Sequence, residues 1–346
     1  MTVQPITETQ AAEKAVEVPP ATEFAAPDRG DSPLRETWHH PRSNVFRVAA
    51  CFWSLLNLGT FDAAYGALLP YLQQSYSVSY VTVSLVFLSP LVGGAHILSA
   101  VINILKPPFP ALVVSFMIAG LGNGLSDAAW NAWIGNLERS NELLGYLHAA
   151  YGVGGVFSPL VATAMITRAA LAWNTFYYVV LGISVVEMLA LTVTFWDHTG
   201  RRYREQMAQS QGTDDKPVSM RTTLTSLPEA RIAWLSALFV LIYIGVEVSV
   251  GGWVVEFMLD VRHGEAFASG MCATGYWLGM TLGRIILPFV TRLIGPLWAV
   301  SMYLGLAMVA ELLFWLVPNF YASAIAVAFQ GFFIGPMFPH AIAVDS

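Results

Sequence analysis

The stretch MIAGLGNGLSDAAWNAWIGNL, residues 117–137, has the length of a membrane span, yet it carries a carboxylate and three asparagines. About 20 mostly apolar residues suffice for a helix to cross the ~30 Å hydrocarbon core of a bilayer. An ionisable side chain at the centre of such a helix costs ~2.5 to 3.5 kcal/mol, so it faces a partner or a cavity instead of lipid. The fold must therefore give Asp127 an interior to face.

Side chains of one helical face recur along this stretch at steps of three or four residues: Asn123, Asp127, Trp130 and Asn131. Hydrogen bonds to neighbouring helices, worth about 0.6 kcal/mol on average, remain an alternative role for the asparagines. For Asp127 a functional role is favoured, because an asparagine would form the same bond without the charge.

The composition of the whole chain is that of a membrane protein. Of 346 residues, 55% are hydrophobic and 12% are charged, about half of the charged share usual in soluble domains. Lipid offers the backbone no hydrogen-bond partner, so long apolar segments must be helices, and the alternating pattern of a membrane barrel is absent. We predict an all-α polytopic protein with about nine spans, at residues 46–69, 81–105, 111–136, 144–167, 173–196, 231–259, 266–290, 297–317 and 320–343.

Basic residues are sparse between positions 48 and 200 and dense between 201 and 231. By the positive-inside rule, this central loop is cytosolic. The first 44 residues are rich in proline, alanine and glutamate and lack an apolar run, so we predict a disordered cytosolic tail without a cleavable signal peptide. The predicted division is a tail at 1–44, an N-terminal bundle at 45–196, a cytosolic loop at 197–230 and a truncated C-terminal bundle at 231–346.

An internal repeat relates the two bundles. NLGTFDAAYG at 57–66 resembles YIGVEVSVGG at 243–252, with both pairs of glycines 186 residues apart. Two further landmarks match at offsets of 190 and 211: Gly93 with Gly283, and Gly120 with Gly331. The offset grows by about one span, so the first half is predicted to lack one helix. A complete protein would have six helices in each half, with two more after Ser346.

A glycine run in the second half predicts a close contact between helices. Gly275, Gly279 and Gly283 are spaced four residues apart, so they share one helical face. Small residues on such a face let two membrane helices approach closely.

Two parallel six-helix halves joined by a cytosolic loop resemble the architecture of major facilitator transporters. FDAAYG at 61–66, GLG at 120–122 and DAA at 127–129 are similar to motifs of the fucose permease-like branch of that superfamily and of its fungal members of the "bypass of stop codon" type. The likeness covers residues 46–343. It departs from the superfamily at the first cytosolic loop, where the Gly-x-x-x-Asp-Arg signature is missing. The counterpart of this signature in the second half begins with Gly283 and Arg284.

The resemblance implies a secondary transporter that moves a small polar solute by proton symport with alternating access, and a sugar is the first candidate for this solute. By resemblance, acids in the first and fourth helices couple protons, and Asp62 and Asp127 match these positions. Desolvation disfavours the charged form of a carboxylate, so such groups can bind and release protons as water access changes. A non-transporting receptor or sensor on the same scaffold and an inactive truncated product remain alternatives.

The candidate substrate site combines aromatic rings with polar groups, because sugars present apolar C–H faces and hydroxyl edges. Arg284 is predicted to act in gating by pairing with an acid near the cytosolic end. Glu187 and Glu311 are interpreted as structural partners and Glu256 as a solvated interfacial residue. The predicted substrate-binding residues are Tyr65, Asn123, Trp130, Asn131, Tyr243, Glu247, Trp253 and Trp277.

Other classes of function lack support in the sequence. Cys51 and Cys272 indicate neither a disulfide framework nor a metal site. No His-rich, Cys-x-x-Cys, Walker or Ser-His-Asp arrangement stands out, so we expect no enzyme, no cofactor, no bound metal and no nucleic-acid partner. The expected partners are the lipid bilayer, protons and a small-molecule substrate. We expect a monomeric integral membrane protein, in the plasma membrane or an internal membrane.

Overall fold

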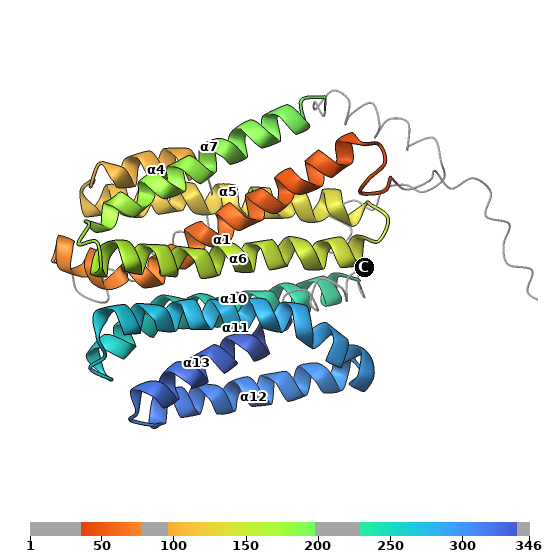
Figure 1. The fold of residues 1–346 in the computed structure, drawn as a ribbon. Helices are drawn as coiled ribbons and strands as arrows, with labels where there is room; N and C mark the ends of the chain where they lie inside the picture. Colours follow the sequence, from red (N-terminus) through yellow and green to blue (C-terminus); the bar gives the residue numbers. More distant parts are fainter. Residues whose placement is uncertain (1–35, 78–95, 198–228, 338–346) are drawn as a thin grey trace, which may run out of the picture. The chain divides into compact units, whose positions relative to one another are not determined.

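The computed structural model describes residues 36–77, 96–197 and 229–337, which are helical almost throughout (Figure 1). An all-α fold, as predicted, is confirmed for these residues. The elements within them are α1 (Ser43–Tyr76), α4 (His96–Ile104), α5 (Phe109–Gly135), α6 (Ser140–Thr167), the short 3-10 helix η2 (Trp173–Thr175), α7 (Phe176–Thr194), α10 (Glu229–Asp260), α11 (Ala266–Ile294), α12 (Pro296–Leu316) and α13 (Phe320–Ile334).

Six segments of the described chain are long and apolar enough to cross a membrane, in α5, α6, α7, α10, α11 and α12. The helix α13 is apolar but has 15 residues in its described part. With 34 residues, α1 is also long enough to cross a membrane. It is less apolar than the six segments named above, because it contains polar residues such as Asn57 and Asp62. The remaining parts of the nine predicted spans, residues 81–95 and 338–343, lie outside the described residues.

The first half is built around α1, which packs against α6, α7 and α5, while α4 packs against α5 and α7. Its core contains buried aromatic rings in edge-on contact. The ring centroids of Tyr65 and Phe116 are 4.8 Å apart at an interplanar angle of 89°, and Phe61 meets Tyr177 at 6.2 Å. Edge-to-face pairs of this kind add to the stabilisation from burial. This packing determines which face of α1 is left for the opposite half.

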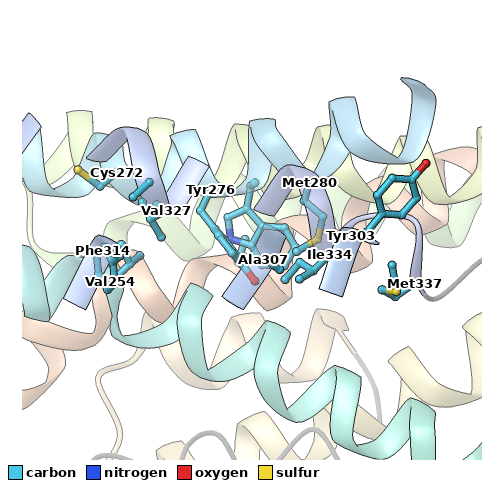
Figure 2. Close-up of a cluster of buried hydrophobic side chains, with 14 of the residues drawn as sticks. Val254, Cys272, Tyr276, Met280, Tyr303, Ala307, Phe314, Val327, Ile334 and Met337 are labelled. Atoms are coloured by element: carbon cyan, nitrogen blue, oxygen red, sulfur yellow. The ribbon is translucent and has the colours of Figure 1, made fainter. Parts of the chain in front are cut away.

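The second half is organised by α11, which contacts α13, α10 and α12. A cluster of buried apolar side chains fills the space between these helices. Figure 2 shows side chains of α11 in a row against those of α13: Cys272, Tyr276 and Met280 with Val327 and Ile334.

The glycine run of α11 lies on its contact with α13, which confirms the predicted close helix contact. A Cβ atom at Gly279 would overlap the carbonyl oxygen of Ala328, and one at Gly283 would overlap that of Phe332. At Gly275, one turn earlier, a Cβ atom would lie 3.8 Å from the Cβ of Ala328, an ordinary contact. The two backbones therefore approach each other most closely at Gly279 and Gly283.

Replacing Gly279 with alanine is expected to destabilise the protein, because the new methyl group must push the backbone of α13 away. Overpacking of this kind costs about 1 to 3 kcal/mol. The matched control is Gly275→Ala, which fits without a clash and gains helix propensity of about 1 kcal/mol. Thermal unfolding of the detergent-solubilised variants should give a lower melting temperature for Gly279→Ala only. Equal melting temperatures would contradict the close contact.

The halves meet where α1 packs against α10 and where α6 packs against α11. A Cβ atom at Gly66 would overlap the carbonyl oxygen of Gly251, and one at Gly155 would lie 2.7 Å from the indole ring of Trp277. Glycines thus permit close approach on both lines of contact. These junctions enclose the cavity described below.

The chain contacts the bundle before residue 45, where the sequence predicted that the disordered tail would end. The amide of Glu138 donates to the carbonyl oxygen of Glu36 at 2.9 Å, and Asn44 Nδ2 donates to the Glu36 carboxylate at 3.0 Å. Residues 36–44 therefore contact the helical bundle, and the division of the chain into tail, bundles and loop stays a prediction. Residues 1–35 and most of the predicted cytosolic loop, residues 198–228, lie outside the described residues.

Candidate functional site

A cavity of about 220 Å³ lies between α1, α5 and α6 of the first half and α10 and α11 of the second. Its wall brings together residues that are up to 229 positions apart in the chain, from Leu55 to Arg284. Seven of the predicted site residues line it: Asp62, Tyr65, Asn123, Asp127, Glu247, Trp277 and Arg284.

Asp62 is held at the cavity by neutral donors from two other helices. Asn123 Nδ2 of α5 donates to Asp62 Oδ1 at 2.7 Å, and the Tyr151 hydroxyl of α6 donates to Asp62 Oδ2 at 3.2 Å. Each carboxylate oxygen therefore has a donor, and neither donor brings a positive charge. Asp62 can bind a proton here without breaking an ion pair to a basic side chain.

Asp127 also lines the cavity, on α5 and one turn after Asn123. Asn131 Nδ2, one turn further along α5, donates to Asp127 Oδ1 at 2.9 Å. The Oδ1 atom of Asn131 lies 3.2 Å from Nε2 of His148, which also lines the cavity. Asn131 thus orients the acid and the imidazole at the same time.

The second half contributes a buried ion pair. Arg284 Nη2 lies 3.4 Å from each carboxylate oxygen of Glu247, and its Nε donates to the carbonyl oxygen of Gly335 at 3.2 Å. Both side chains are less than 8% exposed. The guanidinium also lies 5.3 Å from the ring centroid of Tyr151, whose hydroxyl donates to Asp62. One tyrosine therefore contacts the acid of the first half and the ion pair of the second.

Four predicted site residues are not among those that line this cavity, and their contact with a substrate stays a prediction. Trp130 Nε1 donates to Ser54 Oγ of α1 at 3.0 Å, so its indole nitrogen is directed toward α1. Asn131 acts one layer behind Asp127, as described above. The hydroxyl of Tyr243 accepts a hydrogen bond from Arg284 Nη2 at 3.4 Å. Trp253 packs against the aromatic core of the first half.

Two further residues, Arg284 and Glu256, differ from their sequence interpretation. Arg284 lies in the cavity wall and not near a helix end, although the pairing with an acid is present as predicted. Glu256, predicted to be solvated at the interface, is buried. Glu187, interpreted as a structural partner, has several buried polar neighbours, which are taken up below.

Sequence reasoning missed two residues that touch the site residues directly. Tyr151 lies in the cavity wall, and its spacing of three residues from His148 was the only available signal. His96 Nε2 contacts Asn123 Oδ1. His96 is the first residue of α4 and the isolated histidine of an apolar segment, a weak signal without the neighbouring helices.

Comparison with known proteins places the chain in a family. The family model of the Major Facilitator Superfamily matches residues 91–345. The chain is also similar to Bypass of stop codon protein 6 of Saccharomyces cerevisiae (strain ATCC 204508 / S288c), with 27% identity over 348 residues, covering 86% of this chain and 69% of the relative. The predicted resemblance to the superfamily and to its fungal "bypass of stop codon" type is thereby confirmed.

The fold is similar to that of a bacterial homolog to the human lysosomal transporter Spinster. The inward-facing, unoccupied structure of that protein matches with a TM-score of 0.56 and 14% identity, covering 88% of this chain and 78% of that chain. The inward-facing, occupied structure matches with a TM-score of 0.52 and 13% identity, covering 86% and 74%. At these identities the likeness concerns the fold alone.

Proposed function

Since the chain belongs to the Major Facilitator Superfamily, a family of secondary membrane transporters, we propose that it moves a small polar solute, with a neutral sugar as the first candidate, by proton symport. Asp62 and Asp127 are the coupling acids in this proposal, and Arg284 with Glu247 is the gate between the halves. Alternating access rocks the two bundles about the cavity.

The observation that supports this proposal best is the distribution of charge around the cavity. Three carboxylates line it, those of Asp62, Asp127 and Glu247, whereas Arg284 is the single Arg or Lys among its lining residues. Arg284 pairs with Glu247, so the other two acids have neutral hydrogen-bond partners. A low-dielectric site favours neutralisation of such acids by protons. Proton binding therefore changes the charge of the site at which the solute is held.

The size and the donors of the cavity favour a small hydroxylated solute. A volume of about 220 Å³ is below the ~300 to 1,000 Å³ typical of pockets for drug-sized ligands. Trp277 Nε1 and Arg284 Nη1 are buried and have no hydrogen-bond partner within the described part of the chain. Hydroxyl groups could accept from these donors and donate to the carboxylates, and the Trp277 ring offers a face for sugar C–H groups.

A cationic amine is the second candidate, because the acids that line the cavity outnumber its one guanidinium. An ammonium group would pair with Asp62 or Asp127 directly. It would leave the donors of Trp277 and Arg284 without acceptors, and unsatisfied buried donors cost about 1 to 3 kcal/mol each. This difference favours the hydroxylated solute.

Uptake into proteoliposomes tests the proposal. The full chain is reconstituted with an inward proton gradient of one pH unit and supplied with radiolabelled D-glucose, D-galactose, L-fucose or the diamine putrescine. With one proton per solute, a sugar should accumulate up to about tenfold, because one pH unit corresponds to ~1.4 kcal/mol. An uncoupler should abolish this accumulation. Accumulation of putrescine alone would favour the second candidate, and binding without accumulation would favour a receptor.

A further inference from the structure

A buried pair of a glutamate and a histidine lies in the first half, in the layer of residues behind Asp62. Glu187 of α7 is 6% exposed, and its carboxylate accepts from Ser54 Oγ and from Asn57 Nδ2, each at 2.5 Å. The carboxylate also lies 3.1 Å from Nδ1 of His96 on α4. Glu187 is therefore bound to α1 twice and to α4 once, inside a segment that is otherwise apolar.

The histidine connects this pair to the cavity acid. His96 Nδ1 faces Glu187, and His96 Nε2 faces the amide oxygen Oδ1 of Asn123. The amide nitrogen of Asn123 is already used, since it donates to Asp62 Oδ1. Asn57 Nδ2 also lies 3.3 Å from His96 Nδ1, but both hydrogens of that amide are taken by Glu187 and Ser184. Both ring nitrogens of His96 can therefore donate, and an imidazole that donates from both nitrogens carries a positive charge.

A continuous chain of hydrogen bonds therefore runs from α7 through α4 and α5 to α1. Its order is Glu187, His96, Asn123, Asp62. His96 and Asn123 each contact one neighbour in this chain through one side-chain atom and the other neighbour through a second atom. The orientation of each group therefore sets that of the next. If His96 lost its charge, it would keep one donor only, so it could no longer donate to Glu187 and to Asn123 at the same time.

We propose that Glu187 and His96 are positioning residues for Asp62: through Asn123 they orient its carboxylate toward the cavity and place a positive charge behind it. The inference rests on the proposed role of Asp62 as a coupling acid. The other titratable or charged groups around Asp62 are Tyr151 of α6, Tyr65 of α1, and Glu247 of α10 with its partner Arg284 of α11.

Packing of α7 against α1 alone does not explain why Glu187 is bound by His96 as well. Ser54 and Asn57 already give both oxygens of Glu187 a neutral donor. A glutamine could keep part of these bonds without a charge. The contact between His96 Nε2 and Asn123 Oδ1 is not needed to join α1 to α7, and it connects Glu187 to Asp62.

Glu311 provides the matched control for Glu187. It is also a glutamate in an otherwise apolar helix, but it lies in α12 of the second half, where it interacts with Gln330 of α13. Glu311→Gln removes the same charge as Glu187→Gln without touching the chain to Asp62. The double variant Glu187→Gln/His96→Gln serves as a second test, because it leaves no lone buried charge if Glu187→Gln alone fails to fold.

A carbodiimide assay tests the proposal without any knowledge of the transported solute. Dicyclohexylcarbodiimide reacts with protonated carboxyl groups in apolar surroundings, and mass spectrometry of the purified full chain reports the modified fraction of Asp62. In Glu187→Gln the positive charge behind Asp62 is lost with its counter-ion. The modified fraction at pH 7 should rise about threefold, the lower range of measured coupling between residues in one network. Glu311→Gln should leave it unchanged, and an unchanged fraction in Glu187→Gln would overturn the proposal.

A double-mutant cycle in proteoliposomes supplies the second readout, if one of the sugars above is transported. Glu187→Gln should lower proton-driven uptake about tenfold in the native background, and it should leave exchange unchanged in both the native and the Asp62→Asn backgrounds. Glu187→Asp should restore part of the uptake. Equal losses of exchange in both backgrounds would show that Glu187 acts on packing alone. Absence of proton-driven uptake in the native protein would contradict the proposed function, and the carbodiimide result would still decide the positioning role.

Discussion

Asp62→Asn is expected to abolish proton-driven accumulation while solute exchange across the membrane continues. Asparagine has nearly the same shape as aspartate, and its oxygen can still accept from Tyr151 or Asn123, which bond the native carboxylate at 3.2 and 2.7 Å. It cannot bind and release a proton. Coupling should therefore be lost without collapse of the cavity, and the ratio of inside to outside solute should fall to one.

The measurement uses the proteoliposome assay under two conditions, with a proton gradient and in exchange mode with solute on both sides. Asp127→Asn should behave in the same way, because Asp127 is the second acid of the cavity that lacks a basic partner within the wall. Glu311→Gln, outside the cavity wall, should retain accumulation. Undiminished accumulation in both aspartate variants would refute their role in coupling.

Arg284→Gln is expected to destabilise the protein strongly. The substitution leaves the Glu247 carboxylate buried without its cation, and breaking a buried pair in this way typically costs about 3 to 5 kcal/mol. Glu247→Gln/Arg284→Gln removes both charges and should recover most of this loss. The guanidinium also lies over the ring of Tyr151, so the single variant should weaken the contact between the halves.

Thermal unfolding of the solubilised protein measures both variants against the native chain. Arg292→Gln is the matched control, because Arg292 lies on the same helix but is exposed, beside the ring of Phe289. Its melting temperature should stay close to the native value. A double variant as unstable as Arg284→Gln would show that the loss comes from packing and not from the unpaired charge.

Several properties of this protein follow from the sequence alone. Apolar length, low charge and the repeat between residues 57–66 and 243–252 led to an all-α bundle of two halves, and the structure and the family match agree. The sequence placed Asp127 and Asn131 on one helical face, and in the structure Asn131 donates a hydrogen bond to Asp127 four positions away. The glycines of α11 predicted a close helix contact, because a missing side chain is visible in the sequence.

The tertiary structure alone decided which helices face each other and how each is rotated. Asn123 and Asp62 are 61 positions apart, and Ser54 and Glu187 are 133 apart, so no periodicity relates them. Helical spacing places Trp130 near Asp127 but does not say that its indole turns to Ser54. Periodicity describes a single helix, whereas the fit of side chains between helices sets its rotation. The path from Glu187 through His96 to Asp62 therefore exists only once four helices are packed together.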